Sequence, residues 1–158
     1  MTARSAWRGA AAGLAAGLLA AAAMDLFQRG FAKLQGSDSG GESATTRAAD
    51  RVSEAATGGP VSELRKAAAG QAVHYGFGAL LGTGYGMLAE YWPQATAGAG
   101  APFGLAAAAL IDEGAVPLAG LGKPPWQAPL STHAYSGASH LVFGTAAEAT
   151  RRLVRAAL

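Results

Sequence analysis

Acidic side chains that stand in or beside long apolar stretches are the residues of this chain best placed to do chemistry. One or two of them lie near the C-terminal end of each stretch, where the helix dipole disfavours negative charge, so helix propensity does not explain them. An acid inside a membrane-spanning segment is costly and is a candidate functional group for that reason. The acids concerned are Asp25, Glu90, Asp112, Glu113 and Glu148.

Three histidines accompany these acids. His133 and His140 are seven residues apart, which on a helix places them within about 20° of one face and roughly 10 Å apart along the axis. If successive helices alternate in direction, several of these groups converge at one membrane face, with His140 deeper in the bundle. The predicted cluster consists of Asp25, His74, Asp112, Glu113, His133 and His140.

Such a cluster is suited to proton relay, to binding a divalent metal, or to axial ligation of a haem by two helices. The alternative is that each histidine forms a hydrogen bond with a neighbouring helix or faces the membrane interface. Glu90 and Glu148 are expected at the opposite face as a secondary polar pair. Glu148 has a simple explanation, because Arg151 and Arg152 follow one helical turn later.

Several functional classes are excluded or disfavoured by the composition. The chain has no cysteine, which excludes a disulfide scaffold, an iron–sulfur protein and a thiol catalyst. No G-x-S-x-G, P-loop or H-E-x-x-H motif is present, so no catalytic residues and no enzymatic activity are predicted. The net charge of +2 comes from scattered arginines, and nucleic acid is therefore not an expected partner.

The elements that must position these groups are predicted from the spacing of charge. Only 14% of the 158 residues are charged, whereas 51% are hydrophobic. A helix needs about 20 mainly apolar residues to cross a bilayer. The chain is thus expected to be all-α, a single domain forming a four-helix membrane bundle. A soluble alanine-rich bundle is the alternative, since the mean hydropathy is only +0.20. Charged residues are absent from 9–24, 67–89, 91–111 and 124–147, and the expected spans are about 6–30, 64–91, 97–114 and 131–153.

The first span and the loop after it need separate interpretation. Arg4 and Arg8 before an apolar run resemble a signal peptide, but the run continues without a clear break, which favours a retained helix. The polar loop 35–62 is expected to hold a short surface helix at 42–56, either a solvated connector or a contact for a partner or lipid headgroups. The arginines after the last span favour cytoplasmic termini.

Small residues recur every four positions on three of the expected spans. This spacing lets helix backbones approach closely in lipid. The glycines are expected to pack helices within the chain; the alternative is a seam of a homo-oligomer or a contact with another subunit of a membrane complex. The series are Gly9, Gly13 and Gly17; Gly78, Gly82 and Gly86; and Gly100 and Gly104.

Residues 65–155 resemble the YagU-like family of uncharacterised bacterial inner-membrane proteins. The motifs that carry the resemblance are Val73-His74-Tyr75-Gly76-Phe77-Gly78, Gly84-Tyr85-Gly86, Asp112-Glu113, Gly120-Leu121-Gly122 and Ser139-His140-Leu141-Val142-Phe143. A proline-rich segment typical of that family's first loop is missing here. The resemblance implies a multi-pass inner-membrane protein, with a link to acid tolerance proposed for some members, and assigns no catalytic residues.

Three hypotheses of function follow. The first is a membrane protein that handles protons, ions or a small solute through the His/acid cluster. The second is a structural or accessory subunit of a membrane complex, and the third is a haem or metal protein.

Overall fold

The structure is a computed structural model that describes residues 4–36 and 42–158. Helices are the only regular elements among these residues, so the all-α class is confirmed. Residues 37–41 of the predicted polar loop lie outside the described residues. The elements are α1 (Ala6–Gln35), α2 (Ala44–Thr57), α3 (Glu63–Tyr91), the 3-10 segment η1 (Pro93–Gly100), α4 (Ala101–Ala107), the π-helical segment η2 (Ala108–Ala115), α5 (Val116–Leu118), the 3-10 turn η3 (Pro125–Gln127) and α6 (Leu130–Ala157).

Local sequence sets the ends of the helices. Gly36 and Gly58 follow α1 and α2 with φ of 60° and 82°, a left-handed conformation that glycine adopts at little cost. The Ser43 side chain caps α2 by accepting a hydrogen bond from the Thr46 amide at 3.1 Å. Pro93 directly follows the C-cap of α3, because proline cannot continue the hydrogen-bonding pattern of the helix.

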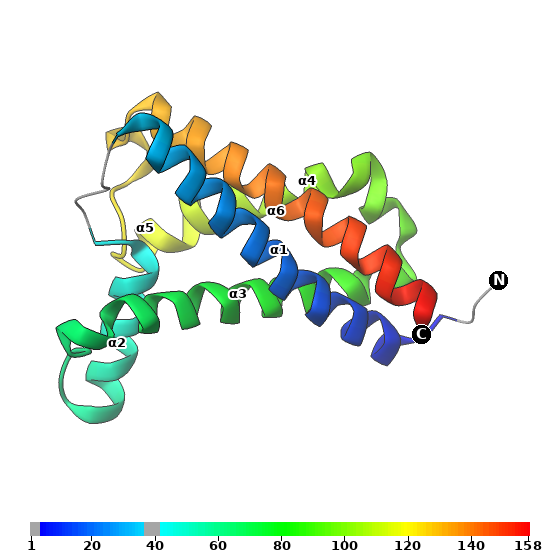
Figure 1. Ribbon diagram of the computed structural model, residues 1–158, viewed down its shortest axis with the longest axis horizontal. Coiled ribbons are helices and arrows are strands. Elements are labelled where there is room, and N and C mark those ends of the chain that lie inside the picture. Colours follow the sequence, from blue (N-terminus) through cyan, green and yellow to red (C-terminus); the bar gives the residue numbers. More distant parts are fainter. Residues whose placement is uncertain (1–3, 37–41) are drawn as a thin grey trace.

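The long helices form an elongated bundle with both chain ends at one end (Figure 1). α1 packs against α3 and α6, and α4 packs against α6. α2 contacts α3 at the end of the bundle away from the termini. We call the two ends the terminal end and the α2 end.

Glycine contacts hold α1 and α3 together, antiparallel, in the half of the bundle nearer the terminal end. Gly13 lies against the Gly82 carbonyl, and Gly17 lies against that of Gly78; a Cβ atom at either glycine would overlap those backbone atoms. Gly9 meets Gly86 in the same way. These glycines therefore pack against one another within the chain.

A second glycine contact joins α6 to the start of α4. Gly100 lies against the Gly144 carbonyl, and Gly104 lies against the backbone of His140 and Gly144. Since both contacts rely on residues without a Cβ, neighbouring backbones come closer than larger side chains would permit. The helices around His140 are therefore held at a fixed separation.

The helix expected over 97–114 is wrong in its first turn and in its regularity. Ala97 has an extended backbone, and Gly98, Ala99 and Gly100 have positive φ, so the α-helix begins at Ala101 and not at residue 97. From Ala108 to Ala115 the backbone is π-helical. A π-helical turn is a rare irregularity that occurs frequently at functional sites.

Two helical stretches are long and apolar enough to cross a membrane, Ala6–Gln35 and Pro93–Leu118. α3 and α6, which hold the other two expected spans, do not meet the same criterion among the described residues. The reason lies in their composition: the charge-free stretch of α3 contains many glycines, two tyrosines and a histidine, and α6 contains several hydroxyl side chains, two histidines and charges in its last turns.

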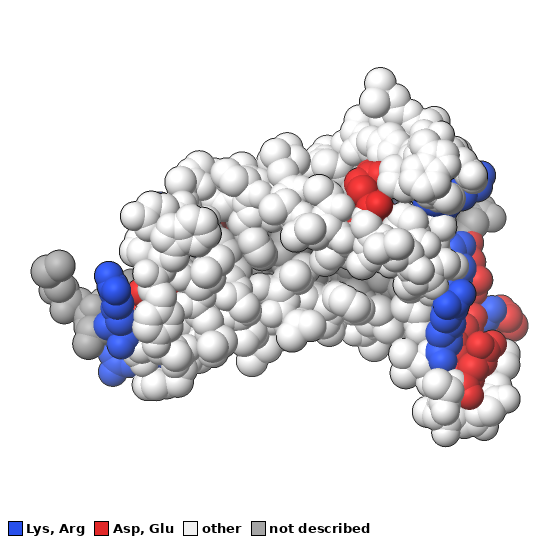
Figure 2. Space-filling view, turned by 180° about the vertical axis from the view of Figure 1, so that it is seen from behind, with Lys and Arg blue, Asp and Glu red and all other residues white. Residues whose placement is uncertain are grey.

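The charged side chains gather at the two ends of the molecule on the face shown in Figure 2, and the surface between them is almost free of charge. Large apolar side chains are exposed along the helices of the bundle. They include Leu14, Leu18 and Leu19 on α1, Leu80, Met87 and Leu88 on α3, and Leu105 and Leu110 on the following segment.

Candidate functional site

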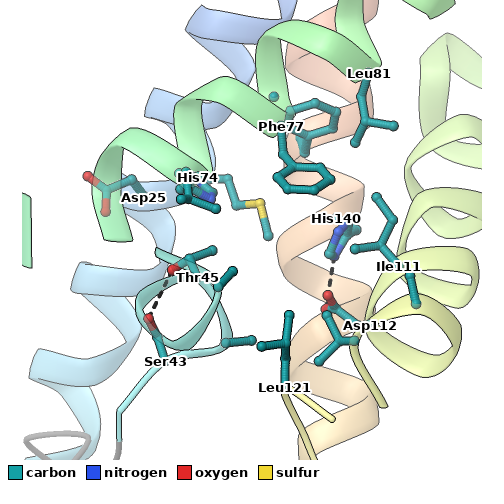
Figure 3. A pocket seen from close by; sticks show the side chains of 18 of the residues that line it. Asp25, Ser43, Thr45, His74, Phe77, Leu81, Ile111, Asp112, Leu121 and His140 are labelled. Atoms are coloured by element: carbon teal, nitrogen blue, oxygen red, sulfur yellow. Dashed lines mark hydrogen bonds and ion pairs between the residues drawn. The ribbon is translucent and has the colours of Figure 1, made fainter. Parts of the chain in front are cut away.

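A cavity of about 480 Å³ lies near the α2 end of the bundle. α1 and α3 form one side, η2 and α6 the other, and α2 borders it (Figure 3). Four of the six residues of the predicted cluster line this cavity: Asp25, His74, Asp112 and His140. The structure thus brings together groups from four separate helical segments.

Asp112 reaches the cavity from the π-helical segment. Its Oδ2 atom accepts a hydrogen bond of 2.5 Å from the Ser136 hydroxyl and lies 3.6 Å from Nδ1 of His140. No lysine or arginine among the described residues forms an ion pair with it. Among the described residues, His140 is therefore the group nearest to the Asp112 carboxylate that can carry a positive charge.

The two cavity histidines are each oriented by a backbone carbonyl. Nδ1 of His140 lies 3.1 Å from the Ser136 carbonyl oxygen, and Nε2 of His74 lies 3.2 Å from that of Ala21. A carbonyl oxygen only accepts, so these nitrogens donate, and in the neutral ring the other nitrogen is an acceptor. Within the described part of the chain, no hydrogen-bond partner lies at His140 Nε2 or at His74 Nδ1.

Asp25 differs from Asp112 in having a cation beside it. Its Oδ2 atom lies 2.7 Å from Arg29 Nη2, one helical turn later, and the Arg29 side chain is 65% exposed. Arg29 itself does not line the cavity. The charge of Asp25 is thus balanced from outside the cavity wall.

Glu113 and His133 form a pair of their own and do not line the cavity. His133 Nδ1 lies 2.7 Å from Glu113 Oε1, and its Nε2 lies 3.2 Å from the Pro125 carbonyl oxygen. A ring that donates from both nitrogens is protonated. This pair joins α6 to the π-helical segment and to the loop that follows, and it is separate from the cavity.

Glu148 and Glu90 lie toward the terminal end, and arginines bind both. Glu148 is 1% exposed; it accepts from the Tyr85 hydroxyl at 2.8 Å and from Arg151 at 2.7 and 2.8 Å, with Arg152 at 2.5 Å. Glu90 binds Arg155 and accepts from the Ser5 amide at 3.0 Å. The bond to Glu90 raises the pKa of Arg155, beyond the last expected span, so Arg155 stays charged.

The cavity does not provide a metal-binding geometry. Among residues 4–36 and 42–158, no three histidine, aspartate or glutamate side chains are grouped so that they could hold one metal ion. His74 and His140 enter the cavity from different helices, each fixed by its own carbonyl. The arrangement is better suited to hydrogen bonding with a solute than to metal ligation.

Sequence analysis missed the uncharged polar residues of this site. Gln28 and Gln71 line the cavity; each is three residues from a predicted site residue, Asp25 and His74, and so shares its helix face. Ser136 is one turn before His140 and binds Asp112. The i, i+3 and i, i+4 spacing would have found all three, but only ionisable residues had been considered.

Comparison with known proteins identifies a family. The model of a family described as protein of unknown function, DUF1440, matches residues 59–149. The chain belongs to this family. No curated protein and no solved structure matches it significantly.

The DUF1440 match begins just before α3 and ends within α6. It therefore includes five of the six predicted cluster residues, and Asp25 on α1 lies outside it. The match covers most of the region whose motifs resemble the YagU-like proteins, but it does not carry that name, which stays a prediction. The DUF1440 description states no activity, so function must be argued from the cavity.

Proposed function

We propose that this DUF1440 protein is an integral membrane protein with four spans whose cavity at the α2 end binds a small solute inside the bilayer. The observation that carries the proposal is the cavity itself. It combines two carboxylates and two oriented histidines with apolar walls. These polar groups lie in or beside long stretches of helix that carry no other charged residue. Small-molecule sites typically have this composition, mostly apolar with a few placed polar groups.

The distribution of charge supports membrane insertion. Charged side chains lie at the two ends, and exposed leucines cover the region between them (Figure 2). A soluble protein rarely exposes so extended an apolar surface. The two helices that meet the criterion for spanning, α1 and the Pro93–Leu118 segment, are packed against α3 and α6, so all four would cross together.

The polar residues of α3 and α6 are compatible with lipid. Thr83 donates its hydroxyl to the Ala79 carbonyl at 2.7 Å, and Thr145 donates to that of Leu141 at 2.8 Å. Such bonds within the helix satisfy a hydroxyl group without water. His74 and His140 face the cavity or a neighbouring helix, where polar residues in a membrane bundle normally lie.

The glycine-packed half of the bundle closes the cavity toward the terminal end, so the cavity opens on one side only. Between the cavity and the terminal end, α1 and α3 are in backbone contact, and Glu148 is enclosed by its partners. The arrangement favours a binding site reached from one side over a continuous pore. In the proposed orientation the termini are cytoplasmic, in a bacterial inner membrane, and the α2 end faces the opposite compartment.

Thiol labelling tests this proposal directly, because the chain has no natural cysteine. Leu81 lines the cavity, whereas its neighbour Leu80 is 68% exposed on the outer surface of the same helix. In reconstituted vesicles, Leu81→Cys is expected to react with a small membrane-impermeant thiol reagent from the α2 side. Leu80→Cys is expected to be protected, because it faces lipid.

Two further variants establish the topology. Thr45→Cys, beside the cavity, and Arg152→Cys, at the terminal end, are expected to react from opposite sides of the membrane. Equal reactivity of Leu80→Cys and Leu81→Cys, or reaction of Thr45→Cys and Arg152→Cys from the same side, would contradict a membrane-spanning bundle. A protected Leu81→Cys beside a reactive Thr45→Cys would contradict an open solute cavity.

A further inference from the structure

We infer that the solute bound in this cavity is a small organic amine in its ammonium form, held by Asp112 through charge and by the free nitrogen of His140 through a hydrogen bond. The inference rests on the proposed function, since it names the chemical class of ligand for the same cavity. It depends on the charge balance, on the hydrogen-bonding groups left unused, and on the nature of the walls.

The charge balance favours a single positive charge. Carboxylates line the cavity, and lysine and arginine are absent from its lining. Arg29, outside the cavity, balances the charge of Asp25, with its Nη2 atom 2.7 Å from Asp25 Oδ2. Asp112, whose side chain is 38% exposed, has a serine hydroxyl and the His140 ring as its polar neighbours and no lysine or arginine partner among the described residues. A monocation would neutralise the Asp112 carboxylate, whereas an anionic solute would be repelled.

The unused hydrogen-bonding capacity is that of acceptors. His140, with a side chain 8% exposed, uses Nδ1 to donate to a carbonyl, and its Nε2 has no partner in the described part of the chain. His74 leaves its Nδ1 free in the same manner. An ammonium group supplies up to three N–H donors and no acceptor, which matches this set.

The walls favour an organic cation over a bare metal ion. Met24, Phe77, Leu81, Ile111 and Phe143 form much of the lining, and both sides of the cavity contribute, since Phe77 and Leu81 come from α3 and Ile111 comes from η2 (Figure 3). A hard cation needs several oxygen ligands, and no three acidic or histidine groups converge within the described residues. An alkyl or aryl group attached to the ammonium would fill the apolar part.

Calorimetry on the purified full-length protein in mild detergent tests the inference. The probes are pentylamine, 1-pentanol and pentanoate, which share one alkyl chain and carry a positive, a neutral and a negative head. Pentylamine is expected to bind at least tenfold more tightly than the other two. Asp112→Asn, which can still accept from Ser136, should weaken pentylamine binding at least tenfold.

Two matched variants distinguish the effect of removing the Asp112 charge from the effect of removing any nearby acidic charge. Asp25→Asn should weaken pentylamine binding less than Asp112→Asn, because Arg29 already neutralises Asp25. Glu113→Gln, outside the cavity, should leave the affinity unchanged. The unfolding temperature of Asp112→Asn is measured on the same sample, and the single variant His140→Gln, which should also weaken pentylamine binding, replaces it if that protein is unstable.

The outcomes distinguish the inference from the proposed function. Equal binding of pentylamine and 1-pentanol, or an unchanged affinity in Asp112→Asn, would overturn the assignment of an amine and leave a solute cavity. Preferred binding of pentanoate, or binding of none of the probes, would overturn it too. The proposed function fails only on the thiol labelling of Leu81→Cys, Leu80→Cys, Thr45→Cys and Arg152→Cys.

Discussion

The terminal end and the α2 end of this bundle hold acids in opposite ways: the Glu148 side chain is 1% exposed, and that of Asp112 is 38% exposed. At the terminal end, the Glu148 carboxylate accepts hydrogen bonds from Tyr85, Arg151 and Arg152. At the α2 end, Asp112 borders a cavity and has no arginine or lysine partner among the described residues.

The difference follows from what lies between the helices. Where glycines face each other, α1 and α3 are in backbone contact and no space remains. Toward the α2 end the larger side chains Met24, Phe77 and Phe143 replace them and the cavity opens. An acid in the closed half must be paired to be tolerated, whereas an acid at a cavity can exchange a partner. We therefore propose a structural role for the first and a binding role for the second.

Adding a side chain at the glycine contact between α1 and α3 should have the largest effect on the free energy of unfolding. Gly82→Ala places a methyl group against the backbone of Gly13 and Gly17, which cannot yield without separating the helices. We expect a loss of about 3 kcal/mol or more in the free energy of unfolding, measured by circular dichroism in detergent. Gly84→Ala, on the same helix with nothing within 4 Å of the added methyl group, should stabilise the helix by up to about 1 kcal/mol.

Equal losses in the Gly82→Ala and Gly84→Ala variants would show that α1 and α3 are not in backbone contact. That result would remove the physical distinction between the closed half and the open half.

Removing the charge of Glu148 should have the next largest effect. Glu148→Gln leaves Arg151, whose side chain is 12% exposed, without its carboxylate, and breaking a buried pair costs about 3 kcal/mol. Glu113→Gln is the matched control, because Glu113 is 32% exposed and pairs with His133; its loss should stay below about 1 kcal/mol. Similar unfolding temperatures for the two variants would argue against a buried network at the terminal end.

Weakening the attachment of α2 should have the smallest effect on the free energy of unfolding, and its effect on hydrogen exchange should be confined to α2. Arg47 donates a hydrogen bond to the Leu121 carbonyl at 2.7 Å, and Arg51 donates one to the Ala119 carbonyl at 2.7 Å. These two bonds attach α2 to the loop that follows α5. Arg47→Ala should cost about 1 kcal/mol and raise hydrogen exchange in residues 44–57. Glu54→Ala, at an exposed position of the same helix, should change neither the free energy of unfolding nor the hydrogen exchange. Unchanged exchange in Arg47→Ala would mean that other contacts hold α2 beside the cavity.

The helices were largely predictable, because apolar stretches, glycines and prolines act locally. The predicted surface helix at 42–56 corresponds to α2, and the α-helices at the last three expected segments begin within about four residues of the expected positions. The irregular turn before Ala101 was not predictable, since positive φ at Ala99 is unusual for a residue with a Cβ and depends on packing against α6. The π-helical turn that holds Asp112 likewise has no sequence signature.

The site was predicted in part. Alternating helices placed Asp25, His74 and Asp112 at one end, and the structure finds them around one cavity together with His140. His133 and Glu113 were expected in the same cluster, but they bind each other instead. Adjacent residues of a helix point about 100° apart, so Asp112 and Glu113 could not both face the cavity, and the sequence does not say which of them does.

By itself, the sequence determined which segments are helical, where charge is absent, and which small residues allow close packing, because these properties depend on neighbours along the chain. Tertiary structure decided the partners: Gly13 with Gly82, Glu148 with Tyr85, Asp112 with Ser136. Each pair joins residues far apart in sequence. Among the described residues, an acid is paired with arginines at one end and has no arginine or lysine partner at the other, because only the packing of helices fixes the distance from an acid to the nearest arginine.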